Sequence, residues 1–189
     1  DAHEGSLLVG RKRLCFDILM ATTPPAANPV PASAPPSIEG TVGFIGTGNM
    51  AEALIKGLLQ AGALRPERLH GSDPRRVRCD EMRARYGINV TTHNEDVMRR
   101  ADIVVLSVKP QILTKVCDEI SPHLRPRALV VSIAAGVPVA VLEAHLPRGT
   151  RVVRVMPNTP ALVGAGATAI AAGGHATEED LQVTRRIFD

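Results

Sequence analysis

Two glycines and an alanine in one short stretch are the residues whose spacing indicates the most specific chemistry. Gly46, Gly48 and Ala51 fill the pattern G-x-G-x-x-G/A. In such a turn the first glycine permits a tight bend, the second lets a ligand approach the backbone, and the small third residue lets the next helix pack closely. Unpaired amides at the helix start attract an anion. The pattern predicts a site for the pyrophosphate of a dinucleotide, with a tight turn that binds no ligand as the alternative.

The elements around this turn must position it. Residues 41–45 read as an apolar strand, and the following helix carries apolar residues on one face at Ala51, Leu54, Ile55, Leu58 and Leu59. Further strands are predicted at 68–72, 89–91, 103–106, 129–133, 151–155 and 167–171. Helices are predicted at 75–86, 94–100 with Asn94 as N-cap, 112–120 and 138–145, and a last helix opens with a capping box at 177–180. This alternation predicts an α/β fold, a Rossmann-like doubly wound, mostly parallel sheet with helices on both faces.

The composition divides the chain at residue 40 and excludes several classes of protein. Residues 1–40 predict a disordered Pro/Ala-rich N-terminal extension, with Met20 as a candidate natural start, and residues 41–189 predict the dinucleotide-binding domain. A net charge of +3 and 2% aromatic residues disfavour nucleic acid as a partner. No apolar run is long enough to span a membrane. The three cysteines are odd in number and widely spaced, which indicates reduced thiols and a cytoplasmic protein. The six histidines are scattered without the spacing of metal ligands, so they support no metal site.

Polar residues follow the predicted second strand, where the ribose of a dinucleotide would lie. Ser72 and Asp73 are followed by Arg75 and Arg76. An acid here binds the ribose hydroxyls of NAD, whereas an arginine holds the 2′-phosphate of NADP, so the cofactor choice stays open. Asp73 could instead cap the next helix, and the arginines could be solvated surface.

Three later strand ends carry further candidates. Lys109, followed by Pro110, suits the nicotinamide side of a cleft. There it could pack on the cofactor, act as a general acid, or simply be exposed to solvent. The small residues from Ala134 to Gly136 permit close approach by a ring or simply pack a tight loop. Asn158 lies between two prolines, where its amide either binds a carboxamide or completes a turn. The sequence shows no recognisable nucleophile, so no catalytic residue is assigned, and redox chemistry by a bound nicotinamide fits best.

Four motifs in register resemble those of pyrroline-5-carboxylate reductase. They are residues 43–51, 107–110, 131–136 and 156–160, and the resemblance runs from residue 41 to residue 189. It implies an NADP (or NAD) cofactor, with Thr47, Asn49 and Met50 at the pyrophosphate, and with Asn94, Val108, Lys109 and Ala135 lining the site. The candidate cofactor-binding residues are Ile45, Gly46, Thr47, Gly48, Asn49, Met50, Ala51, Ser72, Asp73, Arg75, Arg76, Asn94, Val108, Lys109, Pro110, Ala134, Ala135, Gly136 and Asn158.

The resemblance also implies a reaction and partners. The family makes proline by reducing a cyclic imino acid, and it has a second, helical domain that dimerises and supplies most substrate-binding residues. From that domain we expect the full-length protein to form homo-oligomers. The substrate-binding loops of that domain do not occur here, so we expect little or no turnover from this chain alone. The alternatives are a dinucleotide-binding module without catalysis, or another small-substrate NAD(P) oxidoreductase, such as a hydroxyacid dehydrogenase or a deazaflavin-dependent reductase.

Overall fold

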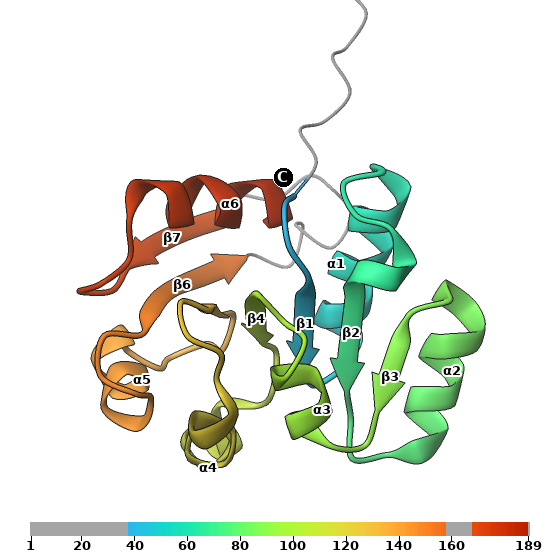
Figure 1. Cartoon of the computed structure of the whole chain (residues 1–189), viewed down its shortest axis with the longest axis horizontal. Helices are drawn as coiled ribbons and strands as arrows, with labels where there is room; N and C mark the ends of the chain where they lie inside the picture. The colour runs from blue at the N-terminus through green and yellow to red at the C-terminus, as the bar shows by residue number, and fades with distance from the viewer. Residues whose placement is uncertain (1–37, 158–167, 189) are drawn as a thin grey trace, which may run out of the picture. The chain divides into compact units, whose positions relative to one another are not determined.

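A computed structural model describes residues 38–157 and 168–188 of the chain. Among these residues, seven strands form one sheet (Figure 1): β1 (Val42–Ile45), β2 (Leu69–Ser72), β3 (Asn89–Thr91), β4 (Ile103–Leu106), β5 (Leu129–Ser132), β6 (Arg151–Pro157) and β7 (Thr168–Ala172). The helices are α1 (Asn49–Gln60), α2 (Arg76–Tyr86), α3 (Asn94–Met98), α4 (Leu113–Ile120), α5 (Val139–His145) and α6 (Glu178–Phe188). Short 3-10 turns lie at Pro66–Arg68, Pro110–Ile112 and Ser121–His123.

The order of the strands places a reversal beside β1. The sheet runs β3-β2-β1-β4-β5-β6-β7, and only the β6–β7 pair is antiparallel. The chain moves outward from β1 to β3, returns to β4 on the other side of β1, and then continues outward to β7. In open sheets of this kind, ligands bind beyond the carboxyl ends of the strands at such a reversal. The predicted mostly parallel, doubly wound sheet is confirmed.

Helices cover both faces of the sheet because each strand alternates apolar side chains between two cores. On β4, Val105 belongs to the core beneath α1, α2 and α6, whereas Val104 and Leu106 belong to the core beneath α3, α4 and α5. Burial on both faces explains why the central strands read as continuous apolar runs. The part of the chain that the structure describes contains no helix both long and apolar enough to cross a bilayer.

Gly43 allows α3 to lie directly on β1. A Cβ atom at Gly43 would come within 2.5 Å of the Val97 Cγ1 atom and 2.8 Å of the Ala101 Cβ atom. Real Cβ atoms do not approach other carbons so closely, so only glycine permits this packing. The close contact holds the helix that follows β3 against the strand that leads into the glycine turn.

The two predicted helix starts at Asn94 and Thr177 have different outcomes. The capping box at Thr177 is confirmed: the Asp180 amide donates to the Thr177 hydroxyl at 3.2 Å, and the Thr177 amide donates to the Asp180 carboxylate at 2.8 Å. Asn94 as N-cap of its helix is wrong, because His93 occupies the cap position and Asn94 is the first helical residue. The Asn94 side chain instead forms hydrogen bonds with Ser72 on β2 and Glu119 on α4.

The first described residues, which precede the expected domain start at residue 41, contact the core. Ile38 is 1% exposed within the core, and its amide donates to the carbonyl oxygen of Ala63 at 3.2 Å. Residues 1–37 and Asn158 lie outside the described residues. The extension over residues 1–40 and the division at residue 41 therefore stay predictions.

Candidate dinucleotide site

The turn between β1 and α1 has the geometry that the glycine pattern predicts. Gly46 has a left-handed backbone with φ of +90°. A Cβ atom there would lie 3.0 Å from both the Ser107 carbonyl oxygen and the Val108 Cγ1 atom. The Gly46 amide donates to the Ser72 carbonyl oxygen at 2.9 Å, which fixes the turn to the end of β2. Both the conformation and the space require glycine at this position.

Gly48 presents the start of α1 without a covering side chain. A Cβ atom at Gly48 would meet nothing within 4 Å among the described residues, and no side chain caps the helix there. The first-turn amides, including those of Asn49 and Met50, therefore have no acceptor within the helix. Ala51 is completely buried, so the helix packs closely on the sheet. This combination of an open N-cap and free amide donors suits a phosphate group.

Ser107 joins the end of β4 to the glycine turn. The Ser107 hydroxyl lies 2.6 Å from the Gly46 carbonyl oxygen and 3.1 Å from the Ile45 carbonyl oxygen. The Ser107 amide also donates to the Ile45 carbonyl oxygen, at 3.0 Å. The residue was not among the candidates, although its place directly after a strand and before Val108 was a usable signal. Through this contact the 107–110 loop is positioned beside the turn.

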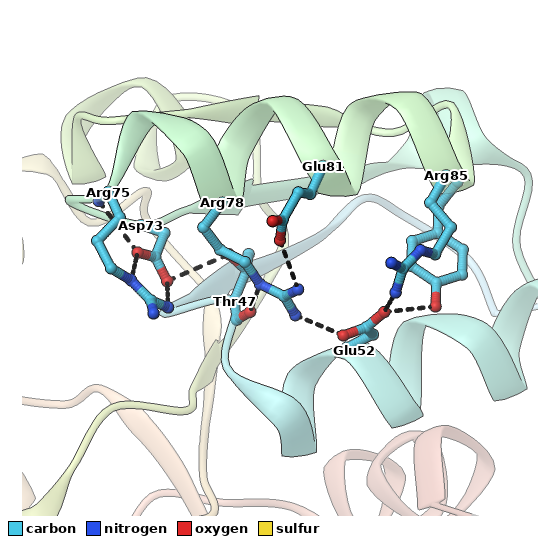
Figure 2. Close-up of polar contacts among 8 residues, drawn as sticks. Thr47, Glu52, Asp73, Arg75, Arg78, Glu81 and Arg85 are labelled. Atoms are coloured by element: carbon cyan, nitrogen blue, oxygen red, sulfur yellow. Dashed lines mark hydrogen bonds and ion pairs between the residues drawn. The ribbon is translucent and has the colours of Figure 1, made fainter.

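Asp73 is enclosed by partners from its own loop and from the glycine turn (Figure 2). The Arg75 guanidinium donates to both of its carboxylate oxygens, at 2.9 and 3.1 Å, and the Arg75 amide donates at 3.1 Å. The buried Thr47 hydroxyl donates to it at 3.3 Å. Burial alone would raise the pKa of the Asp73 carboxyl, but the hydrogen bonds and charge of Arg75 outweigh burial and lower it. Asp73 as the helix cap is wrong, because Arg75 occupies the N-cap position of α2.

The two arginines after Asp73 differ in their surroundings. The Arg75 side chain is 67% exposed while it pairs with a carboxylate that is 6% exposed. Arg76 is 76% exposed and pairs only loosely, at 3.6 Å, with Asp80 on the same helix. Arg75 is therefore held at the end of β2 beside the turn, whereas Arg76 lies on the helix surface.

A second ion-pair cluster joins α1 to α2, and the sequence reasoning missed it (Figure 2). Glu52 in the first turn of α1 accepts hydrogen bonds from Arg78 at 2.6 Å, from Tyr86 at 2.8 Å and from Arg85. The hydrogen bonds from Arg78 and Tyr86 are the largest causes that lower the pKa of Glu52, from 4.5 to about 2. Arg78 also donates from Nε to the carbonyl oxygen of Thr47 at 2.7 Å. No sequence spacing signals contacts between residues 26 positions apart.

Ser72 and Asn94 meet at the carboxyl end of β2. The buried Ser72 hydroxyl donates to the Asn94 side-chain oxygen at 2.6 Å, and the Asn94 amide nitrogen donates to Glu119 at 3.0 Å. The two candidates are therefore brought together. They lie one strand away from the glycine turn, since β2 pairs directly with β1.

The remaining candidates follow β4 and β5, which are neighbours in the sheet. Val108 is half-buried, and Lys109 and Pro110 are exposed. Ala134 is buried, whereas Ala135 and Gly136 are exposed, with Gly136 at φ of +74°. The two loops leave the same edge of the sheet, beside the glycine turn, and small exposed residues there permit a flat ring to approach.

The groups gathered at this edge of the sheet are suited to binding an anionic ligand. Among the described residues, no three His, Cys, Asp or Glu side chains gather as a metal site. Cys79 and Cys117 are buried, and burial is the main cause that raises the pKa of Cys117 to about 11, so its thiol stays protonated. The edge offers amide donors, a fixed arginine and small residues, which are the parts of a dinucleotide cradle.

Comparison with known proteins agrees with this geometry. Residues 41–136 match the family described as "NADP oxidoreductase coenzyme F420-dependent". The chain is 44% identical over 147 residues to the pyrroline-5-carboxylate reductase of Methanosarcina acetivorans, covering 78% of this chain and 54% of that protein. The chain thus spans about half the length of the curated relatives it matches.

Solved structures give the same result. The chain resembles a pyrroline-5-carboxylate reductase from Coxiella burnetii with a TM-score of 0.75 and 34% identity, over 79% of this chain and 55% of that one. A pyrroline carboxylate reductase from Plasmodium falciparum, solved with NADP bound, gives a TM-score of 0.70 and 31% identity over 80% and 55% of the two chains. The chain belongs to the matched NADP oxidoreductase family, and it is similar to about half of the length of pyrroline-5-carboxylate reductases.

Proposed function

We propose that this chain binds a nicotinamide dinucleotide along the carboxyl edge of β2, β1, β4 and β5. The observation that carries the proposal is the open N-cap of α1 at Gly48, above a turn that Gly46 fixes against β2 and β4. The pyrophosphate would lie over the first-turn amides, the adenosine ribose near Ser72 and Asp73, and the nicotinamide near Val108 and the 134–136 loop.

We further propose that the adenosine end of the site favours NADPH over NADH. Both oxygens of the Asp73 carboxylate already accept hydrogen bonds from Arg75, and one also accepts from Thr47. The carboxylate is therefore a poor acceptor for a ribose hydroxyl. Arg75 offers the remaining face of an exposed guanidinium, which suits a 2′-phosphate.

For the whole protein we propose the reduction of 1-pyrroline-5-carboxylate to proline. A bound nicotinamide supplies the hydride in such reactions. The hydride would add to the carbon of the C=N bond and the ring nitrogen would take a proton from solvent, while the residues of this chain would bind and orient the cofactor. The names of the relatives support this proposal. The chain spans about half their length, so we expect it to bind dinucleotide while forming proline slowly or not at all.

The location and assembly of the protein are secondary parts of the proposal. The free, buried thiols of Cys79 and Cys117 are consistent with a cytoplasmic protein. Self-association of the full-length protein stays a prediction from the resemblance.

A fluorescence titration with NADPH and NADH tests the proposal directly. Gly48→Val should weaken NADPH binding at least ~10-fold, since a branched side chain would occupy the space for the phosphate. Folding should be unchanged, because no described atom lies within 4 Å of the added Cβ. Gly57→Val on α1, another glycine with no described atom within that distance, is the matched control for binding. Equal affinity of the two variants would refute the site, and tighter binding of NADH would refute the preference.

A further inference from the structure

Arg78 connects α2 to the backbone of the glycine turn. Its Nε–H donates to the Thr47 carbonyl oxygen at 2.7 Å, between the two glycines of the pattern. Its other nitrogens pair with Glu52 at 2.6 Å and with Glu81 at 3.3 Å (Figure 2). The side chain is only 12% exposed, so the guanidinium is held in one place by three acceptors.

The contact with Thr47 determines the direction of an amide in the turn. The carbonyl of Thr47 and the amide of Gly48 belong to one planar trans peptide, so the two groups point in opposite directions. Holding the oxygen toward α2 turns the Gly48 N–H away from α2. Because Gly48 has no side chain to restrict its backbone, the peptide would otherwise rotate readily.

The ion pair to Glu52 in turn holds Arg78. Glu52 is on the first turn of α1, so the same arginine bridges the peptide before the helix and the helix itself. Arg85 pairs with the same carboxylate but is 58% exposed and approaches from a later turn of α2. The two arginines therefore share a partner and differ in their contact with the glycine turn.

We infer that Arg78 is a positioning residue for the dinucleotide site, which orients the Thr47–Gly48 peptide for the pyrophosphate while Glu52 fixes its guanidinium. The inference rests on the proposed binding of a dinucleotide at this turn. It assigns to Arg78 a role that acts through the Thr47–Gly48 peptide, which its Nε–H contacts at 2.7 Å.

The experiment compares Arg78→Met with Arg85→Met in the 189-residue chain. Each variant removes one ion pair to Glu52. Arg78→Met also removes the hydrogen bond to Thr47 and the half-exposed ion pair to Glu81. The dissociation constant for NADPH is measured at low temperature, where circular dichroism shows each protein to be folded, and urea unfolding gives the stability of each. A contact that served folding alone would change the unfolding curves and leave the affinity of the folded protein unchanged.

We expect Arg78→Met to weaken NADPH binding about 10-fold, a change of ~1.4 kcal/mol, and Arg85→Met to stay within about twofold of wild type. Arg78→Lys should give an intermediate loss, since one ammonium cannot reach Thr47 and both carboxylates together. If Arg78→Met does not fold, the lysine variant serves as the test. Arg78 variants that bind as tightly as Arg85→Met would overturn the inference, whereas a wild-type chain that binds neither dinucleotide would overturn the proposed function.

Discussion

Glu52 is expected to make a pH-dependent contribution to the stability of the domain. Its carboxylate accepts hydrogen bonds from two arginines and a tyrosine on α2, and its side chain is 18% exposed. These contacts, with the hydrogen bonds from Arg78 and Tyr86 the largest, lower its pKa from 4.5 to about 2. A group whose folded pKa is lowered stabilises the fold above its unfolded pKa and loses that contribution as the pH falls through the folded pKa.

The size of the effect follows from the shift. Each pKa unit corresponds to ~1.4 kcal/mol, so lowering the pKa from 4.5 to about 2 gives at most ~3.5 kcal/mol at neutral pH. Because water reaches part of the cluster, we expect Glu52→Gln to reduce the free energy of unfolding by ~1–3 kcal/mol at pH 7. The difference between wild type and variant should be constant from pH 6 to 8. It should narrow below pH 4.5 and fall to about half by pH 3.

Urea unfolding of both proteins at pH 7, 4 and 3, followed by circular dichroism, measures this difference. Glu81→Gln is the matched control, since Glu81 is half-exposed and contacts Arg78 at 3.3 Å. We expect the control to change stability by less than ~0.5 kcal/mol. A Glu52→Gln penalty that stays the same at pH 7 and pH 3 would refute the reasoning, because it would show that shape and neutral hydrogen bonding, rather than charge, hold the two helices together.

Three further predictions concern packing, capping and thiol reactivity. Gly43→Ala should lower the free energy of unfolding by ~1–3 kcal/mol, because its Cβ would lie within 2.5 Å of a neighbouring side chain. Gly57→Ala on α1 should raise stability by ~0.5–1 kcal/mol, and equal effects of the two changes in thermal unfolding would contradict the close packing of α3 on β1. Asp180→Ala should cost ~1–3 kcal/mol in urea unfolding, since it removes both the capping box and the 2.7 Å contact with Arg151, and an unchanged midpoint would contradict this. Cys117, with its pKa raised to about 11 mainly by burial, should react with a thiol reagent at pH 8 only after unfolding, and rapid modification of the folded protein at this cysteine would show otherwise.

The sequence determined those features that depend on neighbouring residues. The alternation of strands and helices, the turn at Gly46 and Gly48, and the capping box at Thr177 are all local patterns, and each appears in the structure. Hydrophobic periodicity fixes which face of an element is buried, and a glycine pattern fixes a turn, so both can be recognised without knowing the rest of the fold.

Only the tertiary structure decided how the polar side chains pair. The sequence left Asp73 open between a ribose ligand and a helix cap, and it did not indicate that Arg75 and Thr47 would both donate hydrogen bonds to its carboxylate. The sequence predicted Asn94 as a helix cap, whereas in the structure its side chain is hydrogen-bonded to Ser72 and Glu119. It gave no sign that Glu52 and Arg78 meet. Such pairs depend on the distance and direction between elements far apart in the chain, which arise when helices pack on a sheet and leave no trace in the spacing of residues.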